Sequence, residues 1–130
     1  LSPLPNNVRH LMKDYWPGGV TIVYYCRINK VGPLVRANRN TLGIRMPDNE
    51  KILKIINEVR VPVLGPSANF HGQTTPFDQA ELNKDFINNV DLVVKGICKI
   101  RQSSTVIDTT ITPWKVLRQG KINVDVSKYQ

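Results

Sequence analysis

Strand-like and helix-like segments alternate through the middle of the chain, and this alternation constrains the fold more than any other feature. Residues 20–26 are β-branched and aromatic, which predicts a strand, and residues 41–45 form a second short strand. A helix is predicted next, because apolar residues recur there at helical spacing, namely Ile52, Ile55, Ile56 and Val59. The apolar run at residues 61–64 predicts a third strand that ends at Gly65. Such alternation indicates an α/β sheet with flanking helices.

The two ends of the chain add a helix and further strands. An apolar stripe predicts a first helix and consists of Val8, Leu11, Met12 and Tyr15. We expect Asn6 to cap this helix and residues 16–19, Trp-Pro-Gly-Gly, to end it. Residues 104–108 and 115–118 predict two strands joined as a hairpin, and residues 122–126 form a short alternating piece.

The segment between these strands carries a helix-start pattern. Thr75, Pro76 and Asp78 supply a hydroxyl N-cap, a proline at the first helical position and a carboxylate in the first turn. We expect that helix to continue through residue 86 and a strand to follow at residues 90–94.

Length, charge and cysteine content limit the class of protein. The chain has 130 residues, which predicts one domain over residues 1–130. No apolar run approaches the roughly 20 residues that span a bilayer, so no membrane association is expected. Cys26 and Cys98 lie far apart without a CxxC pattern, and we expect both to be reduced, buried thiols of a cytoplasmic protein. The net charge of +8 favours polyanionic partners, either nucleic acid or nucleotide phosphates, although we expect the densest basic stretch, residues 27–39, to be a solvated loop.

Several common chemistries have no counterpart in the sequence. There is no GxGxxG motif, no GxxxxGK[ST] motif and no His/Cys cluster with metal-ligand spacing. His10 and His71 are isolated; we expect His10 on a helix surface and His71 in a polar loop. No serine has a histidine and an acid as partners, so no catalytic nucleophile is assigned.

Four segments combine a predicted strand end with small or hydroxyl residues and, in most, a charge. They are residues 41–47, 65–69, 103–108 and 117–120. Arg45 can hold a carboxylate or phosphate, or it can form a surface ion pair with Asp48. Ser67 and Asn69 follow a strand end, where α/β sheets bind ligands, although both residues are also common in ordinary turns. Each segment alone is a weak indication.

Taken together and in order, these segments resemble the YrdC-like threonylcarbamoyl-AMP synthase family. The family pattern runs WPGPLT, TVGVRxPD, (T/P)SAN, GxPSPT, (E)STVVD and LRxG. The matching pieces are residues 16–21, 41–48, 66–69, 72–76, 104–108 and 117–120. The resemblance covers roughly residues 5–124 and implies a twisted mixed sheet with flanking helices, the YrdC-like (DHBP synthase-like) fold, around a concave, positively charged cavity.

The resemblance implies an enzyme that makes threonylcarbamoyl-AMP and pyrophosphate from ATP, L-threonine and bicarbonate. Mg²⁺ would accompany the nucleotide, and the product would pass to the machinery that modifies adenosine in tRNA. Arg45 matches the arginine that holds the threonine carboxylate, and Ser104 matches a threonine-side contact. The matches to ATP contacts are Thr41, Ser67, Asn69, Thr75 and Arg118, with Ser67 and Asn69 at the phosphates.

One departure from the family pattern is large. The family domain carries a TDTxYGL-type and a KxRP-type segment before the WPG motif, and this chain has neither. We therefore expect the chain to be the C-terminal portion of the domain and to need the N-terminal portion for activity. Two alternatives stay open: a non-catalytic module that binds tRNA or double-stranded RNA, and an accessory domain of a carbamoyltransferase.

Overall fold

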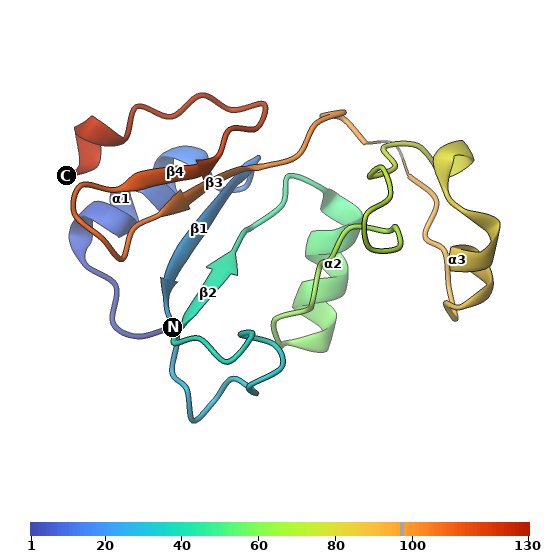
Figure 1. The fold of residues 1–130 in the computed structure, drawn as a ribbon, viewed down its shortest axis with the longest axis horizontal. Coiled ribbons are helices and arrows are strands. Elements are labelled where there is room, and N and C mark those ends of the chain that lie inside the picture. The colour runs from blue at the N-terminus through green and yellow to red at the C-terminus, as the bar shows by residue number, and fades with distance from the viewer. Residues whose placement is uncertain (97) are drawn as a thin grey trace. The chain divides into compact units, whose positions relative to one another are not determined.

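The computed structural model describes residues 1–96 and 98–130 (Figure 1). These residues form two compact units, one made of Leu1–Pro62 with Ser103–Gln130 and the other of Val63–Gln102. We call the first the sheet unit, because it contains every strand assigned in the described residues, and the second the loop unit. Among the described residues, no helix is both long and apolar enough to cross a membrane.

Four strands form one mixed sheet in the order β2-β1-β3-β4 (Figure 1). Their bounds are Val20–Tyr25 for β1, Thr41–Ile44 for β2, Thr105–Asp108 for β3 and Lys115–Arg118 for β4. β1 pairs antiparallel with β2 and parallel with β3, and β3 pairs antiparallel with β4. The mixed sheet confirms the predicted fold class, and the predicted hairpin of the last two strands is also confirmed.

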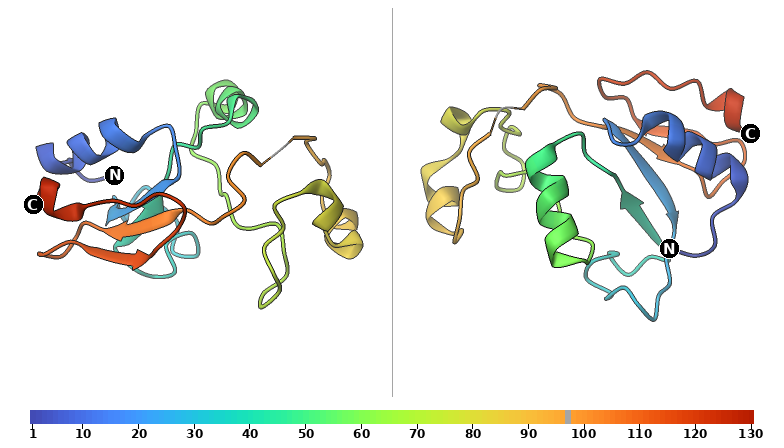
Figure 2. Two further views of the ribbon diagram at one scale, coloured as in Figure 1. Left: turned by 90° about the horizontal axis from the view of Figure 1, so that it is seen from above. Right: turned by 180° about the vertical axis from the view of Figure 1, so that it is seen from behind.

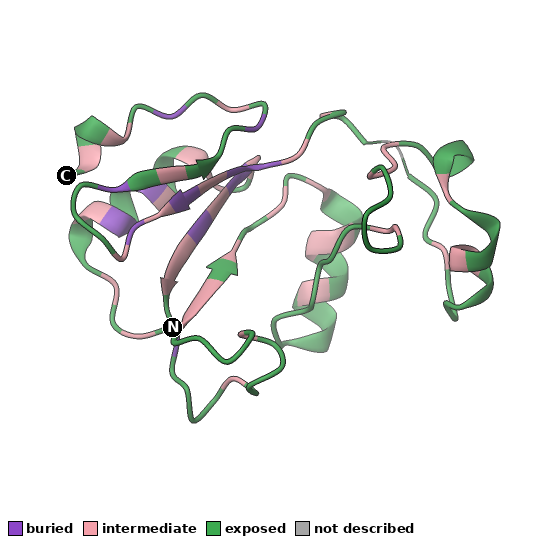
Figure 3. Cartoon of the chain, viewed as in Figure 1, coloured by how far each residue is buried: buried purple, intermediate pink, exposed green. Residues whose placement is uncertain are grey.

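One face of the sheet carries the hydrophobic core. Helix α1 (Asn6–Tyr15) lies against this face, and the purple residues of Figure 3 concentrate in α1, β1 and β3. The buried apolar cluster consists of Val8, Leu11, Val20, Ile22, Ile107, Trp114 and Val124. The predicted cap of α1 is wrong: the Arg9 N–H donates to Pro5 O at 3.1 Å, so Pro5 is the capping residue and Asn6 is already helical.

The end of the chain packs on the same helix (Figure 2). In η2 (Val126–Tyr129), the Tyr129 hydroxyl donates to Asp14 Oδ2 at 2.6 Å. This hydrogen bond is the main reason why the pKa of Tyr129 lies above its usual range. The Tyr129 ring also stacks on Trp114, with 6.3 Å between ring centroids. These contacts fix the C-terminal residues to the core.

The opposite face of the sheet is less buried, and we call it the open face. A Cβ atom at Gly43 would lie 3.4 Å from Thr21 Cγ2 and 3.9 Å from Val23 Cγ2, so these three residues share one face. On β3, Val106 and Asp108 are half-buried and alternate with buried neighbours. The open face therefore comprises Thr21, Val23, Gly43, Val106 and Asp108.

Helix α2 (Glu50–Val59) confirms the predicted amphipathic helix but not the strand after it. Asn49 caps the helix, with its Oδ1 accepting from the Ile52 N–H at 3.1 Å. None of the α2 residues is buried. The helix ends at Arg60, which has a left-handed φ of 56°, and residues 61–64 are exposed and form no strand. An apolar run forms a strand only where a neighbouring strand pairs with it, and this run has no such partner among the described residues.

The loop unit contains two short helical elements. η1 (Gln79–Glu81) begins at Asp78, whose Oδ1 accepts from the Ala80 N–H, and α3 (Lys84–Asn88) begins at Asn83. Thr75 is therefore not the predicted N-cap, because the Asp78 and Asn83 side chains interrupt the predicted helix and start two shorter ones. The strand predicted at residues 90–94 is also wrong, since those residues are unpaired coil in the structure.

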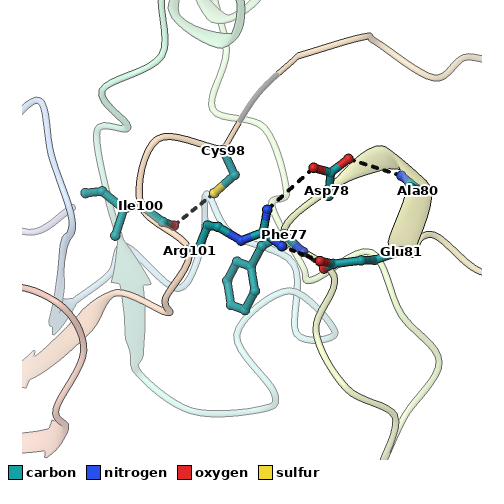
Figure 4. Close-up of polar contacts among 7 residues, drawn as sticks. All are labelled: Phe77, Asp78, Ala80, Glu81, Cys98, Ile100 and Arg101. Atoms are coloured by element: carbon teal, nitrogen blue, oxygen red, sulfur yellow. Dashed lines mark hydrogen bonds and ion pairs between the residues drawn. The ribbon is translucent and has the colours of Figure 1, made fainter.

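Arg101 connects the last residues of the loop unit to η1 (Figure 4). Its guanidinium forms ion pairs with Asp78, at 3.5 Å, and with Glu81.

Both cysteines are free, and Cys26 is buried as predicted. Cys98 is exposed, contrary to prediction, and its thiol donates to Ile100 O at 2.9 Å.

Candidate functional site

Arg118, the last residue of β4, is held against Ser104. Its Nε and Nη2 donate to the Ser104 main-chain oxygen and to Ser104 Oγ, each at 3.0 Å. Ser104 Oγ also lies 2.8 Å from Thr21 Oγ1. Ser104 is 8% exposed, whereas Arg118 is exposed. The structure therefore brings two of the predicted site residues, Ser104 and Arg118, into direct contact.

Gly120 explains why β4 can approach Ser104 so closely. A Cβ atom at this position would lie 2.1 Å from Ser103 O and 2.4 Å from the Ser104 carbonyl carbon. The Gly120 N–H also donates to Thr105 Oγ1 at 3.0 Å. The glycine of the Leu-Arg-Gln-Gly motif is thus required for packing, and it brings the arginine next to Ser104.

Strand β2 carries Thr41, and Arg45 follows directly after it. Thr41 is opposite Tyr25 in the sheet and, by alternation, shares the open face with Gly43. Arg45 is the first residue after β2 and is exposed. The next residue, Met46, accepts a hydrogen bond from the Gly18 N–H at 2.8 Å. The Trp-Pro-Gly-Gly turn therefore fixes the backbone directly after Arg45.

An open hollow of about 270 Å³ lies between the open face and the loop that joins β1 to β2. Its lining includes Val23, Arg36, Arg39, Thr41, Asp108 and Leu117. Arg36 braces the loop, since its Nε donates to Val31 O at 3.1 Å and its Nη1 to Arg39 O at 2.7 Å. The loop was predicted to be solvated, and the structure adds that two of its arginines line this hollow beside Thr41.

The remaining predicted residues, Ser67, Asn69 and Thr75, belong to the loop unit. Asn69 Nδ2 donates to Phe70 O at 3.1 Å and to Gln73 O at 2.9 Å. Its Oδ1 is buried without a hydrogen-bond partner among the described residues. Ser67 is exposed and Thr75 is half-buried. Among the described residues, no hydrogen bond joins the side chains of these three residues to one another.

Sequence reasoning did not assign Thr21 or Asp108 a role, although both lie inside the quoted motifs. Thr21 is a polar residue between two buried positions of a hydrophobic strand, and this pattern could have indicated that its side chain has a role. Asp108 Oδ1 accepts from the Thr110 N–H at 2.9 Å and from its hydroxyl at 2.6 Å. This carboxylate therefore orders the turn after β3 while it faces the hollow.

Comparison with known proteins identifies the family. The family model for Sua5, YciO and YrdC, described as "Telomere recombination", matches residues 1–120. The chain belongs to the Sua5/YciO/YrdC family. This confirms the resemblance seen in the motifs.

The chain is also similar in sequence to individual proteins of the Sua5/YciO/YrdC family. The chain is 34% identical over 95 residues to the threonylcarbamoyl-AMP synthase of Bacillus subtilis, covering 73% of the chain and 28% of that protein. It is 31% identical to the synthase of Pyrococcus abyssi, covering 94% of the chain and 36% of that protein. The chain thus spans about a third of the length of these relatives.

Solved structures of the family match the fold. The crystal structure of P. abyssi Sua5 complexed with L-threonine gives a TM-score of 0.85 at 32% identity, covering 92% of this chain and 35% of that one. Escherichia coli YciO gives a TM-score of 0.81 at 27% identity, covering 98% of this chain and 61% of that one. Both matches agree with the mixed sheet and its flanking helices.

Proposed function

We propose that the chain is part of a threonylcarbamoyl-AMP synthase that acts on ATP, L-threonine and bicarbonate. The observation that carries the proposal is the exposed Arg118, held by Ser104 at the end of β4 in a chain 31–34% identical to two proteins of that name. The product would supply threonylcarbamoyl modification of tRNA. Two free cysteines support a reducing, cytoplasmic setting.

The proposed chemistry needs positioned charge more than a nucleophilic side chain. The threonine amine combines with bicarbonate and loses water, which gives a carbamate. A carbamate oxygen then attacks the α-phosphorus of ATP, and pyrophosphate leaves. Holding the two reactants together and stabilising the negative charge on the phosphates lowers the barrier for this step.

Each predicted residue has a proposed role in that step. Arg118 binds ATP. Arg45 is exposed after β2, and its guanidinium binds the threonine carboxylate through a bidentate pair of hydrogen bonds. Ser104 lies on the threonine side. The other proposed nucleotide contacts are Thr41 on the open face and Ser67, Asn69 and Thr75 in the loop unit.

Magnesium enters the proposal with the ATP substrate. Among the described residues, no group of three His, Cys, Asp or Glu side chains is placed to hold a metal ion. The phosphates would therefore supply most of the ligands, as they do in many nucleotide sites. Bound magnesium would neutralise part of the phosphate charge, and Arg118 would add to that effect.

Pyrophosphate release tests the proposal. It is measured for the chain alone and for the chain mixed with the part of the B. subtilis relative that the chain does not cover. We expect release in the mixture that requires ATP, L-threonine and bicarbonate. Arg118→Ala should lower it roughly 10- to 100-fold, the usual effect of losing hydrogen bonds to a charged group. Arg27→Ala, which removes an exposed charge in the loop after β1, is the control and should change it little. No release in either sample would contradict the proposal.

A second candidate function is RNA binding without catalysis. The net charge of +8 favours it, as do the two arginines that line the hollow. The chain is titrated with tRNA and with duplex RNA at increasing salt. A steep loss of affinity with salt, together with no binding of ATP, would favour this function over the synthase.

A further inference from the structure

We infer that Thr21 is a positioning residue that orients Arg118 through Ser104. The inference rests on the proposed function, because it concerns the arginine assigned to ATP. Thr21 belongs to β1, Ser104 directly precedes β3, and Arg118 ends β4. Since β1, β3 and β4 are neighbours in the sheet, the three side chains form a line across it.

The guanidinium of Arg118 has two hydrogen-bonding edges, and Ser104 occupies one of them. The edge made by Nε and Nη2 donates to the Ser104 main-chain oxygen and to Oγ, both at 3.0 Å. The edge made by Nη1 and the second N–H of Nη2 makes no hydrogen bond to any residue that the structure describes. A free guanidinium edge fits two oxygens of a phosphate group. Ser104 therefore sets the direction in which Arg118 presents this edge.

Thr21 in turn holds the Ser104 hydroxyl. A guanidinium can only donate hydrogen bonds, so Ser104 Oγ is the acceptor from Arg118. The second contact of Ser104 Oγ is Thr21 Oγ1 at 2.8 Å, and either hydroxyl can donate in it. Ser104 is 8% exposed, so water replaces Thr21 poorly if its hydroxyl is removed. Without Thr21 the Ser104 hydroxyl is free to rotate, and its bond to Arg118 weakens.

The contacts among these three residues distinguish binding of the nucleotide from orientation of the residue that binds it. Arg118 is the residue proposed to touch the nucleotide. Both partners of the Ser104 hydroxyl are side chains of the protein, so the hydroxyl orients Arg118 in addition to the threonine-side role proposed for Ser104 above. Thr21 acts through Ser104 and needs no contact with any substrate.

Nuclear magnetic resonance of the ligand-free chain tests the inference. Thr21→Val keeps the shape of the side chain and removes its hydroxyl, while Thr21→Ser restores the hydroxyl and is the matched control. In Thr21→Val we expect the Arg118 Nη2–H protons, one of which is donated to Ser104 Oγ, to exchange with water about 2- to 10-fold faster, the range given by one hydrogen bond. The affinity for ATP should fall by a similar factor. Thr21→Ser should keep the wild-type exchange rate and affinity.

The exchange rate is independent of the proposed function because it needs no ligand. A wild-type exchange rate in folded Thr21→Val would overturn the inference. If Thr21→Val does not fold, Ser104→Ala removes the same link, and an unchanged exchange rate there would also overturn it. Faster exchange in Thr21→Val, together with no pyrophosphate release from the wild-type chain mixed with the rest of the B. subtilis relative, would leave Thr21 as the positioning residue and would count against the synthase assignment alone.

Discussion

The sheet unit and the loop unit are held together by different kinds of contact. In the sheet unit, a cluster of buried apolar residues lies between α1 and the sheet. In the loop unit, none of the described residues is buried, and its contacts are helix caps, ion pairs, other hydrogen bonds and one edge-on ring contact between Phe70 and Phe86. Burial removes apolar surface from water and stabilises a fold far more than exposed polar contacts do.

This difference extends to the candidate site residues. Arg118 is fixed by Ser104, which lies on a different segment of the chain and depends on the packing of β3 and β4. Asn69 is fixed by Phe70 and Gln73, its near neighbours in sequence. Damage to the core should therefore disturb Arg118, whereas the arrangement around Asn69 depends on local sequence.

The largest effect should come from removing a core side chain. Leu11 is fully buried, so Leu11→Ala should destabilise the sheet unit by about 2–5 kcal/mol, through lost burial and the cavity left behind. Leu34→Ala, in the loop after β1 of the same unit, is the control; Leu34 is 93% exposed, and its loss should change stability by no more than about 0.5 kcal/mol. Urea unfolding followed by tryptophan fluorescence measures this, because Trp16 and Trp114 both lie in the sheet unit. Equal effects of the two changes would contradict the comparison.

The next largest loss of stability is expected from a substitution at Gly120. Gly120→Ala would place a methyl group 2.1 Å from Ser103 O, so β4 must shift, at a cost of about 1–3 kcal/mol. The shift should also weaken the bond from Arg118 to Ser104. Gly32→Ala, in the loop after β1 of the same unit, is the matched control, because a Cβ atom there meets nothing within 4 Å. The same urea titration measures both variants, and a stable Gly120→Ala would show that the close approach is not required.

The same difference explains which features could be predicted from the sequence. The strands and helix α1 were predictable because their alternating or helical patterns reflect burial against one core. The contact between Ser104 and Arg118 was not predictable in its geometry, since it depends on the register of β3 and β4 and on the space that Gly120 leaves. Motif order indicated only that both residues belong to one site.

In the loop unit, patterns that resemble buried elements were misleading. Residues 90–94 are valine and leucine except for Asp91, but among the described residues no strand lies beside them, so they form none. Thr75 has the residue type of an N-cap, but Asp78 and Asn83 start the observed helical turns instead. Without burial to select one arrangement, competing caps of similar strength decide where each helix begins.

The smallest loss of stability should come from removing one of those helix caps. Asn83 Oδ1 accepts from the Asp85 N–H at 2.7 Å and from the Phe86 N–H at 3.3 Å, and it begins α3. Asn83→Ala should therefore cost about 1 kcal/mol locally, and faster hydrogen exchange at the amides of Asp85 and Phe86 should report it. Asn88→Ala at the other end of α3 is the matched control, because the Asn88 side chain caps nothing in the described helix. The tryptophan-detected unfolding of the sheet unit should stay unchanged in both variants, since the cap stabilises only its own short helix. A shift of that transition in Asn83→Ala would mean that local capping in the loop unit also supports the core.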